Sequence, residues 1–231
     1  MPGQINYYNQ FGDLYKQSIL DCPEPEYWTT DYHVRGRVYR EMKERIDLQQ
    51  QLVDEYFNKD LPILDIGCGF GRQAVLLAKK GFSITGTDTS GVFIDIAKQL
   101  FAKHSYKGEF LCLNIIENEL PGHFPQILLL DVLEHVEPHQ RRKLFEKLHT
   151  MGEAGSMLIL SLPHVKKRVT SQLNNRLRRR ITQYSTYFLN REEHPYPIPE
   201  KSAMLKLSEG LFSLHKFIES TQTDYYVFRR D

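Results

Sequence analysis

Leu64-Asp65-Ile66-Gly67-Cys68-Gly69-Phe70-Gly71-Arg72 is the stretch of sequence that decides the fold. Its glycines stand at alternate positions, directly after an apolar segment at residues 62–66 and directly before a helical pattern at residues 72–80. Glycine permits a tight turn and lets the backbone approach a ligand closely, because it has no Cβ. In open α/β sheets such a loop lies at the carboxyl ends of the strands, where ligands bind. We therefore expect a strand, a ligand-binding loop and a helix here.

The same alternation of strand and helix continues along the chain. Apolar, strand-like segments are expected at residues 62–66, 82–87, 109–113, 126–130 and 156–161, and helical patterns at 37–57, 72–80, 94–103 and 138–149. Strands that alternate with helices favour a parallel sheet with right-handed crossovers. Two further strand-like runs, at 211–218 and 225–228, are separated by polar residues and predict a closing hairpin with an antiparallel edge strand.

An acidic residue follows the second expected strand, where a nucleotide site requires one. Asp88 lies 17 residues after Gly71, and a carboxylate there accepts hydrogen bonds from both hydroxyls of a ribose. The alternative is a turn that only reverses the chain, with Asp88 as a helix cap. The spacing Gly-x-Gly-x-Gly differs from the Gly-x-Gly-x-x-Gly of dinucleotide enzymes, and no Gly-Lys-Ser/Thr follows it as in a P-loop. The pattern thus disfavours the first class and excludes the second.

Residues 64–71 closely resemble the first motif of the class I S-adenosylmethionine (SAM)-dependent methyltransferases. Asp88 matches the ribose-binding acid of that family, and residues 129–136 resemble its fourth-strand motif. The resemblance covers roughly residues 60–163. It implies an α/β fold: a Rossmann-like, doubly wound, mostly parallel seven-stranded sheet, with an antiparallel C-terminal edge hairpin and helices on both faces. It also implies SAM as the cofactor.

The resemblance assigns roles at the methionine end of the cofactor. Asp65 organises the loop and, with Gly67, holds the methionine amino group. Gly69 and Gly71 allow close approach of the backbone. Asp131 borders the methionine end.

At the adenosine end, the resemblance places Asp88 and Thr89 on the ribose and beside the adenine. Asn114 stands where the family often has an acid that bonds the adenine amine; an amide oxygen still accepts this bond but brings no charge. The implied cofactor-binding positions are Asp65, Gly67, Cys68, Gly69, Gly71, Asp88, Thr89, Asn114 and Asp131.

Two histidines are candidates for a general base. Methyl transfer to a hydroxyl or amine requires that the acceptor lose a proton, and histidine has a suitable pKa. His135 follows the fourth strand at the mouth of the expected site, and His164 follows the fifth strand. The alternative for His135 is a structural or capping role.

A metal site is an alternative that we do not favour. Asp131, Glu134 and His135 place two carboxylates and an imidazole close together, and the arrangement looks like the divalent-cation site of ubiquinone-type O-methyltransferases and small-RNA 2′-O-methyltransferases. A bound divalent cation would lower the pKa of an acceptor oxygen. Asp131 already has a cofactor-side role, however, and many relatives look metal-free.

Residues 164–181 contain seven Lys and Arg residues and no Asp or Glu, with apolar residues at every fourth position. The pattern predicts a basic helix with an apolar stripe. A crossover helix with a solvated basic face is the simplest interpretation. An anionic acceptor, peripheral membrane contact or RNA are the functional alternatives. The aromatic N-terminal segment, which includes Tyr8 and Phe11, either folds over the cofactor or packs on the sheet.

Length and composition indicate which broad classes of protein the chain can belong to. The chain has 231 residues, a net charge of +1 and 41% hydrophobic residues, which gives no overall signal for nucleic acid or membrane. No apolar run approaches the roughly 18 residues of a membrane span, and the N-terminus lacks a secretory layout. Three cysteines without metal-type spacing make a disulfide framework or zinc site unexpected, so we expect a cytoplasmic protein.

These observations predict four regions: an N-terminal helical cap (1–60), a SAM-binding core (61–163), a basic acceptor-side lid (164–205) and the C-terminal hairpin (206–231). The expected function is methyl transfer from SAM to oxygen or nitrogen of a small or lipid-like acceptor. An RNA methyltransferase and a non-catalytic SAM-binding or partner-binding protein are the alternatives.

Overall fold

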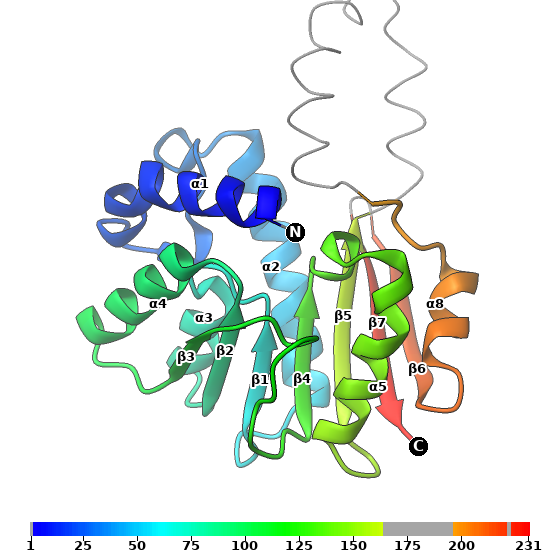
Figure 1. The fold of residues 1–231 in the computed structure, drawn as a ribbon. Helices are drawn as coiled ribbons and strands as arrows, with labels where there is room; N and C mark the ends of the chain where they lie inside the picture. Colours follow the sequence, from blue (N-terminus) through cyan, green and yellow to red (C-terminus); the bar gives the residue numbers. More distant parts are fainter. Residues whose placement is uncertain (1, 164–195, 221–222) are drawn as a thin grey trace, which may run out of the picture.

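The computed structural model describes residues 2–163, 196–220 and 223–231. Within them, a seven-stranded sheet forms the centre of the fold (Figure 1). Its strands are β1 (Ile63–Ile66), β2 (Ile84–Asp88), β3 (Glu109–Cys112), β4 (Gln126–Leu130), β5 (Met157–Pro163), β6 (Phe212–Glu219) and β7 (Thr223–Arg230). The strand order is β3-β2-β1-β4-β5-β7-β6. Strands β1 to β5 are parallel, whereas β7 is antiparallel to both β5 and β6, so the predicted fold is confirmed.

Helices cover both faces of the sheet, because successive residues of each strand point to opposite sides. In β4, Ile127 and Leu129 pack on the face covered by α5 (Arg141–Met151) and α8 (Lys201–Ser208). Leu128, between them, packs on the opposite face. That face is covered by α2 (Arg37–Tyr56), α3 (Arg72–Lys79) and α4 (Gly91–Lys103).

Most expected boundaries lie within a few residues of those observed. The largest shifts are at the starts of α4 and α5. Helix α5 begins at Arg141 after a separate 3-10 turn (Pro138–Gln140), because a proline fits a first turn but not a helix interior. Helix α4 begins at Gly91, since the Ser90 hydroxyl accepts a hydrogen bond from Phe93 N at 3.2 Å and caps it.

An N-terminal helix, α1 (Pro2–Leu20), lies above the carboxyl ends of the parallel strands (Figure 1). The sequence analysis expected a helical cap over residues 1–60 but gave bounds only for the helix at 37–57. It is followed by 3-10 turns at Pro25–Tyr27 and Tyr32–Val34. Its aromatic side chains join a separate apolar cluster with Trp28, Phe70 and Phe93. Phe70 belongs to the glycine loop, and its ring lies 5.8 Å from Trp28 and 6.1 Å from Phe93. The cap is therefore anchored directly on the loop.

Gly12 sets how closely α1 approaches α4. A Cβ on Gly12 would lie 2.7 Å from Val92 Cγ1 and 3.2 Å from the Phe93 ring. We predict that Gly12→Ala displaces α1, with a net loss of about 1 kcal/mol in the local stability of this helix, because overpacking exceeds the gain in helix propensity. Hydrogen exchange of the α1 amides measures this loss directly.

Gly91→Ala is the matched control, since a Cβ there meets only Cys112 Sγ, at 3.8 Å. We expect wild-type exchange in α1 for this variant. If the α1 amides of Gly12→Ala also remain as protected as in the wild type, the close packing of α1 on α4 is wrong.

Candidate active site

The glycine loop between β1 and α3 follows a path that side chains rarely allow. Gly67 has φ +68, and a Cβ on it would come within 2.3 Å of Val132 Cγ2. Gly67 N and Cys68 N both donate to Thr87 O, at 2.7 and 3.0 Å, which holds the loop beside the end of β2. Glycine at position 67 is therefore needed for both the turn and the close packing.

The three loop glycines do not share one role. Gly67 and Gly69 line the two cavities described below, whereas Gly71 lines neither of them. Gly71 (φ +86) is the N-cap of α3, and a Cβ on it would lie 3.2 Å from Ala97 Cβ. It contributes to helix initiation and close packing, and its close approach to a ligand stays a prediction.

Asp88 ties the loop to the end of β2. Its Oδ2 accepts a hydrogen bond from Gly69 N at 2.9 Å, and its Oδ1 accepts one from Ser90 N at 2.8 Å. Burial raises the pKa of Asp88, while these backbone donors act in the opposite direction. The N-cap of α4 is Ser90 and not Asp88. The Asp88 carboxylate lines a cavity, and its ribose role stays a prediction.

Asp65, at the end of β1, is a buried acid with unused hydrogen-bonding capacity. It is 3% exposed, and its Oδ2 has no hydrogen-bond partner within the described residues. Burial, and then the charge of Asp88, raise the pKa of Asp65 to about 7. An unpartnered buried carboxyl is costly unless a ligand completes it. A cationic group such as an amine fits this position.

A first cavity of about 210 Å³ lies beside β2 and β3. Gly67, Gly69, Asp88, Thr89 and Asn114 line it, together with apolar residues that include Leu113 and Ile115. The Asn114 side chain also stabilises the local backbone, since its Oδ1 accepts a hydrogen bond from Ile116 N at 3.0 Å. An apolar slot with polar groups at one end suits a nucleoside.

A second cavity of about 430 Å³ lies between α2, the glycine loop and the end of β4. The predicted residues Asp65, Cys68 and Asp131 line it, and burial raises the pKa of the Cys68 thiol well above its usual value. Arg45 and Gln49 of α2 line it as well. Both cavities share Tyr8, Gly67, Gly69, Phe93, Asp131 and His135, so they adjoin along one wall.

Asp131 is held in place from two sides. It has φ +56, an uncommon backbone conformation for a residue other than glycine. Its Oδ1 accepts a hydrogen bond from Ser161 Oγ at 2.9 Å, and its Oδ2 forms an ion pair with Arg45. The end of β4 is thereby joined to both β5 and α2.

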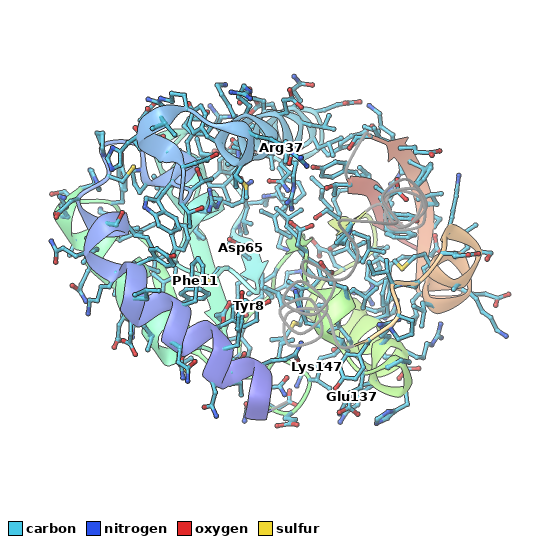
Figure 2. The ribbon with its side chains drawn as sticks, turned by 90° about the horizontal axis from the view of Figure 1, so that it is seen from above. Tyr8, Phe11, Arg37, Asp65, Glu137 and Lys147 are labelled. Atoms are coloured by element: carbon cyan, nitrogen blue, oxygen red, sulfur yellow. The ribbon has the colours of Figure 1, made fainter. Side chains whose placement is uncertain are left out.

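His135 lies where the cavities adjoin, and α1 contacts both of its ring nitrogens. Gln4 Nε2 is 3.3 Å from Nδ1, and the Tyr8 hydroxyl is 3.4 Å from Nε2. Figure 2 shows Tyr8 on the inner side of α1, the side on which Asp65 also lies. This arrangement fits the expectation that the aromatic N-terminus folds over the site.

The residues of the metal alternative lie near one another, but Asp131 is paired elsewhere. Glu134 and His135 belong to one 3-10 turn (Leu133–His135), and Glu134 Oε1 lies 3.9 Å from His135 Nε2. Both line the second cavity with Asp131, whose Oδ2 forms an ion pair with Arg45. Within the part of the chain that the structure describes, no group of three or more His, Cys, Asp or Glu side chains could hold a metal ion. Asp131, Glu134 and His135 therefore do not form the site that was considered.

His164 and the basic segment 164–181 lie outside the described residues. Conversely, the sequence analysis missed Gln4, Arg45, Gln49 and Arg72. For Arg45 and Gln49 the sequence does contain a signal. With Met42 they are spaced three and four residues apart on the predicted helix before β1, which places them on one face of that helix. All three line the second cavity.

None of the described helices is both long and apolar enough to cross a membrane.

Sequence comparison identifies relatives for part of the chain. Residues 63–155 match the family model described as "Methyltransferase domain". The ubiquinone biosynthesis O-methyltransferase of Rickettsia bellii is 31% identical over 143 residues, which are 61% of this chain and 59% of that protein. The mitochondrial enzyme of the same name from Schizosaccharomyces pombe is 31% identical over 103 residues, 43% of this chain and 37% of that protein. The chain thus spans less than two thirds of the curated relatives it matches.

Solved structures resemble nearly the whole chain. Magnesium protoporphyrin IX methyltransferase from Synechocystis with bound SAM has a TM-score of 0.68 at 16% identity, covering 98% of this chain and 94% of that chain. The N-methyltransferase NodS from Bradyrhizobium japonicum with S-adenosylhomocysteine has a TM-score of 0.62 at 16% identity, covering 94% of this chain and 97% of that chain. With its motifs, its strand order and the matched family model, the chain contains a methyltransferase domain of the class I SAM-dependent family, whose cofactor is SAM.

Proposed function

We propose that this chain transfers the methyl group of SAM to a hydroxyl oxygen of a small acceptor. The observation that supports this most directly is the pair of adjoining cavities that share His135 and Asp131. One cavity suits an adenosine, and the other has room for a methionine end and an acceptor. Methyl transfer needs both reactants in line within one enclosed space, and two adjoining cavities would allow this.

The residues present fit the cofactor. Asp88 and Thr89 would hold the ribose, and the apolar residues around Asn114 would enclose the adenine. Asp65, with its unpartnered Oδ2, would accept a hydrogen bond from the amino group. SAM supplies a methyl group on a cationic sulfur, so the chain itself has only to position the acceptor and remove its proton.

His135 is the proposed base for that proton. It borders both cavities, and the contacts from Gln4 and Tyr8 fix the plane of its ring. Gln4 and Tyr8 lie four residues apart and so share one face of α1. We infer that they are positioning residues, and that the helix they come from also shields the reacting atoms from water.

An oxygen acceptor is favoured over nitrogen by the names of the relatives, which are O-methyltransferases of ubiquinone biosynthesis. The second cavity combines charged groups with apolar side chains such as Met42 and Leu130. Such a lining suits a small molecule with one polar end. The basic segment at 164–181, on which the RNA and membrane alternatives were based, lies outside the described part of the chain.

The test is calorimetric titration of the purified protein with SAM and S-adenosylhomocysteine, with NADH as the control nucleotide. We expect saturable binding of the two sulfur compounds only. Turnover is then measured on hydroxylated aromatic and aliphatic acceptors, with and without magnesium. Binding without turnover on any acceptor class would favour the non-catalytic alternative, and no binding would refute the proposal.

The raised pKa of Asp65 predicts how cofactor affinity depends on pH. The ionised carboxylate holds an ammonium group better than the neutral acid, so binding lowers this pKa, which is about 7 in the free protein. Affinity for S-adenosylhomocysteine should therefore rise with pH through about 7 and fall by up to about tenfold per unit below it. Calorimetry in buffers of different ionisation enthalpy should detect proton release on binding near pH 6.

Asp65→Asn is the matched variant, since it keeps the shape of the side chain. It should bind the product more weakly and without this pH dependence. If the pH dependence persists in Asp65→Asn, another group is responsible and Asp65 does not hold the amine.

The base role of His135 predicts a selective loss of turnover. His135→Gln should lower kcat roughly 10²- to 10⁴-fold, the usual contribution of a general base, with nearly unchanged affinity for S-adenosylhomocysteine. Tyr8→Phe should lower kcat less and should shift the NMR titration of the His135 ring, because it removes the hydroxyl 3.4 Å from Nε2. Wild-type turnover in His135→Gln would make this histidine structural.

A further inference from the structure

Arg141 is the first residue of α5, and its guanidinium is buried beside the turn that carries His135. The residue is only 4% exposed. A buried guanidinium costs free energy unless both its donors and its charge have partners. We propose that Arg141 is a positioning residue for methyl transfer, which fixes the turn of His135 in place and balances the buried Glu134 carboxyl beside the histidine ring. The inference rests on the proposed function, because it takes His135 as the base.

The donors of Arg141 join two segments that lie far apart in the sequence. Its Nε donates to Val136 O at 3.0 Å, directly after the turn Leu133–His135. Its Nη2 donates to Pro197 O at 2.9 Å, in the segment before α8. Because a guanidinium is planar and its donors have a fixed geometry, Arg141 sets the position of one carbonyl relative to the other. The turn of His135 cannot shift without loss of a buried hydrogen bond.

A second hydrogen bond joins the same two segments. The Tyr196 hydroxyl donates to Glu137 Oε1 at 3.1 Å. Ile198, two residues further on, packs against the apolar core on the side of the sheet that α5 covers. The segment at Pro197 is therefore itself held in place, so it gives Arg141 a fixed point from which to hold the turn.

The charge of Arg141 has a counterpart in Glu134. Glu134 is fully buried, and its Oε1 lies 3.9 Å from His135 Nε2. Burial lowers the pKa of Arg141, and the charge of Glu134 acts against this effect. By the same interaction, Arg141 favours the ionised form of Glu134. An ionised Glu134 in turn stabilises the imidazolium that forms when His135 takes the proton of the acceptor.

Other titratable groups also lie around the histidine ring. The Tyr8 hydroxyl of α1 is 3.4 Å from Nε2. Asp131, at the end of β4, borders the same two cavities and is paired with Arg45. Substitution of Arg141 leaves these groups unchanged, so a change in the titration of His135 reports on the interaction through Glu134.

The test measures turnover and the NMR titration of the His135 ring in Arg141→Gln, with the ring signal assigned by its loss in His135→Gln. We expect kcat to fall roughly 10- to 100-fold, because a small displacement of a reacting group is enough for such a loss. Affinity for S-adenosylhomocysteine should be unchanged. The midpoint of the His135 titration should fall by roughly one pH unit, because Glu134 loses the charge that keeps it ionised. Arg141→Lys keeps the charge but not the fork, so it should restore the midpoint fully and kcat only in part.

Glu134→Gln tests whether Arg141 acts through Glu134. This variant should lower the midpoint of His135 by a similar amount, and Arg141→Gln added to it should cause no further fall. A further fall of similar size in the double variant, or an unchanged or raised midpoint in Arg141→Gln alone, would overturn the proposed balance of charge.

Arg142→Gln is the matched control on the same helix. Arg142 Nη1 donates to Leu207 O and Glu209 O, and its guanidinium pairs with Glu146, away from the turn. This variant should keep the wild-type kcat and the wild-type titration of His135.

Affinity for S-adenosylhomocysteine is the control for folding. If Arg141→Gln does not bind it, Arg141→Lys and Glu134→Gln carry the test. Wild-type kcat and an unchanged His135 titration in a folded Arg141→Gln would show that Arg141 has no positioning role, with the proposed function intact. Failure of the wild type to bind SAM and S-adenosylhomocysteine would instead refute the proposed function.

Discussion

The hydrogen bond from Gly69 N–H to the Asp88 carboxylate is the interaction on which the rest of the site depends. It holds the loop after β1 against the end of β2, and the other oxygen of Asp88 accepts from Ser90 N, where α4 begins. One side chain thereby sets the relative positions of two elements that border the first cavity. Phe93, in the first turn of α4, then contacts Phe70 of the loop, so the aromatic cap rests on the same arrangement.

The helical cap connects the glycine loop to the proposed base, His135. Helix α1 packs through Phe11 and Gly12 onto Phe93 and Val92, and the same helix brings Gln4 and Tyr8 to His135. A shift of the glycine loop would move Phe70 and Phe93, and with them the helix that fixes the histidine ring. The cofactor-side loop and the proposed base are in this way coupled through packed aromatic rings. A movement of the glycine loop would then change both the enclosure of the site by α1 and the position of the His135 ring.

The sequence predicted the core well because its signals are local. Strand β4, nearly all apolar, was placed without error, and the loop with Asp88 followed from spacing alone. Helix α1 and the role of Arg45 depend instead on contacts across more than 80 residues, such as that of Arg45 with Asp131. Glu134 and His135 do lie close together, with Glu134 Oε1 3.9 Å from His135 Nε2, whereas Asp131 pairs with Arg45, a contact that the local sequence does not predict.

The distribution of charge around the loop bears on the proposed function. Asp65 and Asp88 lie close enough that the charge of Asp88 raises the pKa of Asp65. Asp65 lines the second cavity together with Arg45 and Arg72, so this cavity presents charges of both signs to a ligand. Under the proposed function, the amino group of the cofactor would supply the buried Asp65 carboxyl with the hydrogen-bond donor that it lacks within the described residues. The acid at the end of β1 would then favour a nucleoside that carries an amine.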